Sequence, residues 1–181
     1  KLGEGGGAMN IVGIDPGMGG AIAFIRPGND VVIEDMPVIA IASGAVRRRV
    51  DGYALKWLLL RHCPAVEPVR VFCEDISIAM GGKGKTSAAT IISLARTLGA
   101  IEGVTDAIRF PMQLVPPKDW QGFYGLKGKT KQDKRAHGEL PQAVLKARML
   151  YPQASHMLDR VRDLDRAEAL LIAHYGLRTL T

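Results

Sequence analysis

The chain opens with two apolar segments that are separated by a glycine-rich break. Residues 10–15 read Asn-Ile-Val-Gly-Ile-Asp, residues 20–25 read Gly-Ala-Ile-Ala-Phe-Ile, and Pro16 and Gly17 lie between them. Short runs rich in β-branched residues on either side of such a turn are typical of a β-hairpin. The apolar residues of such a hairpin must be buried, so later segments of the chain are expected to pack against the sheet that it begins.

The rest of the chain alternates between strand and helix patterns. Further strands are predicted at 31–34, 69–76 and 112–115, and helices at 51–62, 86–108, 140–151 and 165–175. Asp51 is predicted to cap the first of these helices. Residues 40–49 show no clear period and are predicted to form a loop. Strands followed by strand–helix alternation favour an α/β fold with a mixed sheet. Residues 1–8 are interpreted as a tag remnant, and residues 9–181 as a single domain.

Charge and cysteine content narrow the class of function. The chain carries 24 basic and 18 acidic residues, a net charge of +6, which favours a polyanionic partner. Two cysteines, Cys63 and Cys73, are too few for a disulfide framework and favour a reducing compartment. No apolar run approaches the ~18 residues of a membrane-spanning helix, so no membrane association is predicted.

Carboxylates occupy three positions that favour a metal site. Asp15 ends the first strand, while Glu74 and Asp75 lie on opposite faces of a later strand, and the pattern leaves open which of them faces the site. Asp165 and Glu168 are three residues apart at the start of a helix, so they share one face. Oxygen ligands of this kind suit Mg²⁺ or Mn²⁺. A turn, a solvated edge strand and a helix dipole are the structural alternatives for the three positions.

Three motifs carry a resemblance to a known family. They are Ile11-Val-Gly-Ile-Asp-Pro-Gly, Val71-Phe-Cys-Glu-Asp, and Asp165-Arg-Ala-Glu-Ala-Leu-Leu-Ile-Ala. In order and spacing they resemble the RuvC-type Holliday junction resolvases of the RNase H-like superfamily, with similarity to the phage and plant chloroplast members. The resemblance implies an α/β fold of the RNase H-like kind, with a mixed five-stranded sheet flanked by helices.

The same resemblance implies an activity and its residues. The catalytic and metal-binding carboxylates would be Asp15, Glu74, Asp165 and Glu168, holding two Mg²⁺ ions for which Mn²⁺ can substitute. The enzyme would be a structure-selective endonuclease of four-way DNA junctions, making symmetric nicks with 5′-phosphate and 3′-hydroxyl ends. Two symmetric cuts imply a homodimer, and the apolar helix at 86–108 is the candidate interface.

Basic residues gather in three places where DNA contacts are expected. Some stand in an arginine run, some in a glycine-rich loop, and some in a segment that interleaves lysines with aromatic residues. The candidates are Arg47, Arg48, Arg49, Lys83, Lys85, Lys118, Lys127, Lys129 and Lys131. A solvated turn is the alternative for the arginine run, and a disordered surface loop is the alternative for the glycine-rich loop. In the third segment, Trp120 and Phe123 could instead pack inward, so that only the lysines meet solvent.

Other functions remain open at the level of sequence. A nuclease of the same fold could act more broadly on flaps and forks, and a junction-binding protein would not cut at all. The segment Ala79-Met-Gly-Gly-Lys-Gly-Lys-Thr fits a relaxed phosphate-binding loop, so a nucleotide hydrolase using Lys85 is a further alternative. The expected location is the cytoplasm of a bacterial or phage-infected cell, or an organellar stroma if a transit peptide was removed.

Overall fold

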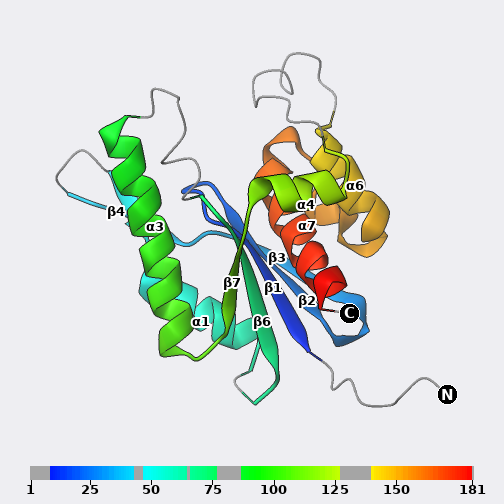
Figure 1. Ribbon diagram of the computed structural model, residues 1–181, viewed down its shortest axis with the longest axis horizontal. Helices are drawn as coiled ribbons and strands as arrows, with labels where there is room; N and C mark the ends of the chain where they lie inside the picture. The colour runs from blue at the N-terminus through cyan, green and yellow to red at the C-terminus, as the bar shows by residue number, and fades with distance from the viewer. Residues whose placement is uncertain (1–8, 43–46, 65, 77–86, 127–139, 181) are drawn as a thin grey trace.

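A mixed five-stranded sheet forms the centre of the molecule (Figure 1). The computed structural model describes residues 9–42, 47–64, 66–76, 87–126 and 140–180. The strands lie in the order β3-β2-β1-β6-β7. Their bounds are β1 Asn10–Asp15, β2 Ala21–Arg26, β3 Asp30–Asp35, β6 Val69–Glu74 and β7 Met112–Val115. The first three strands pair antiparallel, whereas β6 pairs parallel with both β1 and β7. The predicted hairpin and the mixed five-stranded sheet are confirmed.

Helices cover both faces of the sheet (Figure 1). One face carries α7 (Leu164–Thr179), α6 (Gln142–Leu150) and α4 (Pro117–Phe123), and the other carries α1 (Gly52–His62) and α3 (Ala88–Ala107). Short 3₁₀ turns complete the chain: η1 (Pro27–Asn29), η2 (Pro152–Met157) and η3 (Val161–Asp163). Within the described residues, no helix has both the length and the apolar character needed to span a bilayer.

Strand alternation divides the buried side chains into two cores. Ile11 of β1 and Phe72 of β6 belong to the core under α7, whereas Val12 and Ile14 belong to the core under α1 and α3. Successive side chains of a strand point to opposite faces, so each strand feeds both cores. This rule also fixes which face the polar residues at the strand ends join.

Side chains cap the two helices on the face away from α7. The carboxylate of Asp51 accepts hydrogen bonds from the backbone N–H groups of Tyr53 and Ala54, which confirms the predicted start of α1. The hydroxyl of Ser87 accepts from the backbone N–H of Thr90 at the start of α3. Both caps satisfy N–H groups that a helix cannot pair internally.

Two glycines let α7 approach the sheet closely. A Cβ placed on Gly13 of β1 would lie 2.2 Å from the carbonyl oxygen of Ala169 and 2.3 Å from the backbone nitrogen of Ala173. A Cβ on Gly176 of α7 would lie 2.2 Å from the ring of Phe72. The absence of these side chains therefore sets the distance between α7 and the strands β1 and β6.

The loop predicted over 40–49 is wrong in part. A two-stranded hairpin pairs β4 (Val38–Ala40) with β5 (Arg48–Val50), with Val38 opposite Val50. Each strand has three residues, too few for alternation to be read from sequence. The hairpin is anchored by Val50, which is buried in the core under α1 and α3.

A carboxylate cluster at the carboxyl end of the first strand

Asp15 is the last residue of β1, and its side chain lies on the α7 face of the sheet. Alternation places it on the same face as Ile11 and Gly13, both of which face α7. The chain turns directly after it, and the backbone N–H of Gly17 donates to Asp15 Oδ1 at 3.4 Å. Asp15 is half-buried, so the strand end presents one carboxylate to the amino-terminal end of α7.

The first turns of α7 bring two more carboxylates to Asp15. Asp165 and Glu168 are half-buried, and one oxygen from each of the three side chains lies within 4.8 Å of the others. Oxygens on opposite sides of a divalent cation lie about 4–5 Å apart, so this spacing fits a hard metal ion. We call Asp15, Asp165 and Glu168 the carboxylate cluster. Packing of α7 on Gly13 is what unites residues from the two ends of the sequence.

Glu74 also faces α7, which resolves the choice that the sequence left open. Its strand is parallel to β1 with Cys73 opposite Ile14, so Glu74 and Asp15 end neighbouring strands. Glu74 shares its face with Phe72, whereas Asp75 follows the last residue of β6. The indole Nε1 of Trp120 donates to Glu74 Oε1 at 3.1 Å. Glu74 lies outside the group of three oxygens within 4.8 Å.

The hydrogen bond from Trp120 was not foreseen. The sequence pattern left two possibilities for this residue, an inward packing position or a nucleic-acid face, and the structure buries it in α4 at 1% exposure. A buried indole N–H needs an acceptor, and here the acceptor is a predicted metal ligand. The hydrogen bond from Trp120 therefore restrains the orientation of the Glu74 carboxylate. Phe123 in the same helix is 52% exposed.

Arginine–aspartate pairs hold the start of α7 in place. Arg166 donates from Nε and Nη2 to the two carboxylate oxygens of Asp35 at 2.6 and 2.9 Å, joining α7 to the end of β3. These hydrogen bonds lower the pKa of Asp35 below its usual value of 3.8. Just before the helix, Arg160 donates to the buried carboxylate of Asp163 from its backbone N–H, Nε and Nη2. No local sequence pattern indicates the first pair, because its partners are 131 positions apart.

His174 belongs to an aromatic group and not to the carboxylate cluster. Its Nδ1 lies 2.8 Å from the hydroxyl of Tyr151, and its ring makes edge contacts with Tyr151 and Tyr124. Burial, and secondarily the charge of Arg178, lowers the pKa of His174 below its usual value of 6.5. A neutral imidazole bound to a tyrosine is a packing element of the α6–α7 layer.

The predicted DNA-binding residues fall into two groups. Arg47, Arg48, Arg49 and Lys118 are exposed, with Arg48 and Arg49 on β5 and Lys118 in the first turn of α4. The other predicted contacts lie outside the described residues. They are Lys83, Lys85, Lys127, Lys129 and Lys131. The phosphate-binding-loop motif at 79–86 also lies outside them, although the strand before it, β6, is described.

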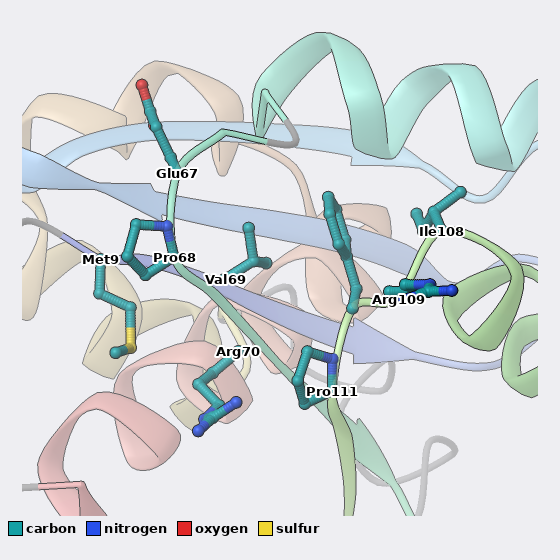
Figure 2. Close-up of a pocket in the computed structure, with 9 residues that line it drawn as sticks. Met9, Glu67, Pro68, Val69, Arg70, Ile108, Arg109 and Pro111 are labelled. Atoms are coloured by element: carbon teal, nitrogen blue, oxygen red, sulfur yellow. The ribbon is translucent and has the colours of Figure 1, made fainter.

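A cavity of about 440 Å³ lies at the opposite end of the sheet (Figure 2). It adjoins the amino-terminal ends of β1 and β6, with Arg70 and Arg109 on its rim. Its only carboxylate among the residues that line it is Glu67, which accepts a hydrogen bond from Asn10. This cavity offers no group of metal ligands, so the carboxylate cluster is the candidate chemical site.

Comparison with solved structures finds the same fold. RuvC from Thermus thermophilus matches with a TM-score of 0.52 and 16% identity, over 96% of this chain and 98% of that one. The T. thermophilus RuvC in complex with Holliday junction substrate also matches with a TM-score of 0.52 and 16% identity, over 94% and 96%. No protein-family model and no curated protein sequence matches the chain. The RuvC-like, RNase H-like fold expected from the motifs is confirmed.

Proposed function

We propose that this chain is a divalent-metal-dependent endonuclease that resolves four-way DNA junctions by symmetric phosphodiester hydrolysis. The observation that carries the proposal is the carboxylate cluster of Asp15, Asp165 and Glu168, formed on a fold shared with RuvC over nearly its whole length. One of the two matched structures is a complex with a Holliday junction substrate. The net charge of +6 is consistent with a polyanionic substrate.

The donor set suits two Mg²⁺ ions, with Mn²⁺ as a substitute. Four carboxylates on one face of the sheet, Asp15, Glu74, Asp165 and Glu168, are the ligands we assign to them. Bound there, the ions would supply Lewis-acid activation of a water and charge stabilisation at the scissile phosphate. The protein's part is positional. β1 and β6 fix two carboxylates, α7 fixes the other two, and Trp120 restrains Glu74.

Binding of the DNA arms is assigned to the basic residues that the sequence predicts as DNA contacts. Arg47, Arg48 and Arg49 lie exposed at the small hairpin, and Lys118 lies exposed in α4, which follows β7 directly. Lys83, Lys85, Lys127, Lys129 and Lys131 complete the proposed set from sequence alone. Such an enzyme would work in the cytoplasm of a bacterial or phage-infected cell, or in an organelle.

A homodimer is proposed because two symmetric nicks need two sites. The exposed residues of α3 include Ala88, Ile92, Ala95, Gly99 and Gly103, which are apolar or small, and also the charged Arg96 and Asp106. Small residues allow a second helix to approach closely. We expect Gly99→Arg to convert a dimer to a monomer in sedimentation equilibrium, while Arg61→Glu on α1 leaves the dimer intact. A wild-type chain that sediments as a monomer at micromolar concentration would refute the dimer.

The proposed activity is tested by comparing one sequence in three forms: a four-way junction, a flap and a linear duplex. With Mg²⁺ we expect paired symmetric nicks in the junction alone, with ends that DNA ligase can seal. Equal cutting of the flap would instead indicate a broader branched-DNA nuclease. If no DNA is cut with Mg²⁺ or Mn²⁺, the proposal fails, and ATP turnover then tests the nucleotide-hydrolase alternative.

Asp15→Asn separates catalysis from folding. The substitution keeps the size of the side chain and removes its charge, so we expect cutting to fall by at least about 10³-fold with junction affinity within about threefold of wild type. Asp75→Asn is the matched control, because it removes the same charge from a carboxylate that lies directly after β6 and outside the group of three oxygens within 4.8 Å. Loss of folding in Asp15→Asn, seen by circular dichroism, would identify Asp15 as structural.

A further inference from the structure

A groove of about 540 Å³ adjoins the carboxylate cluster at Asp165. It runs from the start of α7, past the turn after β1, to the first residue of β4. The turn backbone faces the cluster here, because a Cβ on Gly19 would lie 3.6 Å from Asp165 Oδ2. The residues that line it are Met18, Gly19, Gly20, Asp35, Met36, Val38, Arg160, Arg162, Asp163, Asp165 and Arg166. Its volume lies in the range of about 300–1,000 Å³ that accommodates small-molecule-sized groups.

Two arginine–aspartate pairs in the groove balance their own charges. Arg166 is held by both oxygens of Asp35, and Arg160 is held by Asp163. Each carboxylate binds two nitrogens of its guanidinium group. These four residues shape the groove wall and contribute no net charge.

Arg162 is the unbalanced cation of the groove. It lies in η3, is exposed, and makes no hydrogen bond or ion pair with any residue in the described ranges. Asp165 is the remaining charge, and in the proposed function its carboxylate is neutralised by bound metal. The guanidinium of Arg162 would then be the one positive charge in the groove that no described protein group neutralises.

We propose that this groove binds a backbone phosphate of the scissile DNA strand, one or two positions from the phosphate at the carboxylate cluster, with Arg162 as its contact. The inference rests on the proposed function for the identity of its ligand. A planar guanidinium matches phosphate oxygens in pairs, which favours arginine for such a contact. Met18, Met36 and Val38 supply an apolar wall suited to the sugar that follows the phosphate.

Arg162 is a positioning residue in this proposal, and its binding energy fixes the strand beside the cluster. Arg162→Gln should weaken junction binding about five- to tenfold, since an exposed ionic contact is worth less than a buried one. Removing one phosphate contact should also reduce the slope of log affinity against log salt by about 0.7–0.9. Arg61→Gln, the same charge change on α1 at the other face of the sheet, should leave the slope within error of wild type.

The decisive experiment pairs Arg162→Gln with a neutral phosphate. A synthetic junction carries a single methylphosphonate, moved one position at a time through the nucleotides on either side of the branch point, and binding is measured in Ca²⁺ by fluorescence anisotropy. We expect one or two positions where the neutral group weakens wild-type binding about fivefold but costs Arg162→Gln nothing further. Arg61→Gln should lose affinity at the same positions as wild type does.

Cutting in Mg²⁺ is recorded on the same substrates, so that the two proposals fail separately. If wild type binds the junction but never cuts it, the proposed function fails while the anisotropy coupling still tests the groove. The fold-losses of affinity from Arg162→Gln and from the methylphosphonate can simply multiply at every position, which means that the two changes act independently. In that case Arg162 contacts no single phosphate, and the inference is overturned. An unchanged salt slope in Arg162→Gln overturns it as well.

Discussion

Gly13→Ala tests whether the packing of α7 on β1 is what assembles the carboxylate cluster. The added methyl would lie 2.2 Å from the carbonyl oxygen of Ala169, a shortfall of about 1.2 Å against the 3.4 Å at which ordinary contact begins. The obstructing atoms belong to the helix backbone, so no side-chain rotation relieves the clash. The helix must retreat, and Asp165 and Glu168 must retreat with it.

The size of the effect follows from the same distances. Overpacking costs typically 1–3 kcal/mol, and a clash with backbone belongs at the upper end, about 3 kcal/mol. For a chain of this size that lowers the melting temperature by about 6–12 °C. Metal coordination tolerates displacements of only about 0.2 Å, so a retreat of about 1 Å should weaken Mn²⁺ binding about 10–100-fold.

Mn²⁺ binding is measured by electron paramagnetic resonance of the free ion, and folding by circular dichroism. Gly176→Ala is the matched clash variant, because its methyl would meet the ring of Phe72 at the other end of α7. It should lose stability and keep its Mn²⁺ affinity. Gly122→Ala meets nothing within 4 Å and should change neither quantity. A folded Gly13→Ala protein with wild-type Mn²⁺ affinity would refute the argument.

Four further substitutions test individual contacts of the structure. Trp120→Phe removes the donor to Glu74 and should weaken Mn²⁺ binding about tenfold, with junction affinity in Ca²⁺ unchanged. Tyr151→Phe should cost about 1 kcal/mol in thermal unfolding at pH 8, since it removes the hydrogen bond to His174. The pKa of His174 is lowered in the folded state, so protonation of this side chain opposes folding. The stability that neutral His174 confers is present above pH 6.5 and is lost as the pH falls. The melting temperature of His174→Gln should therefore depend less on pH between about 5 and 7. Although burial raises the pKa of Asp163, hydrogen bonds from its arginine partner lower it overall, so Asp163→Asn should cost about 1–2 kcal/mol in urea unfolding at pH 7 and much less at pH 3.

Local patterns in the sequence predicted most of the fold. The apolar runs of β1 and β2, the cap at Asp51 and the helix that holds Asp165 and Glu168 are all confirmed, because each is determined by residues a few positions apart. The hairpin of β4 and β5 was missed for the opposite reason. Its pairing, not its composition, defines it, and three-residue strands carry no readable period.

The candidate site was predictable in its residue types but not in its orientations. Whether Glu74 or Asp75 faced the site depended on which face of β6 received α7, a fact set by Phe72 and Gly176 meeting across the core. The burial of Trp120 against Glu74 joins residues 46 positions apart, and alternation within one segment contains no information about such contacts.

The carboxylate cluster can assemble only late in the synthesis of the chain. Asp15 belongs to the first strand and Asp165 to the last helix, 150 positions later in the chain. At about 5–20 residues per second, a ribosome needs roughly 8–30 s to travel from one to the other. During that interval the nascent chain has Asp15 and, once β6 is made, Glu74, but it lacks the helix that supplies Asp165 and Glu168. Contacts this distant in sequence also form late in folding. Under the proposed function, the site is therefore incomplete until α7 has been translated.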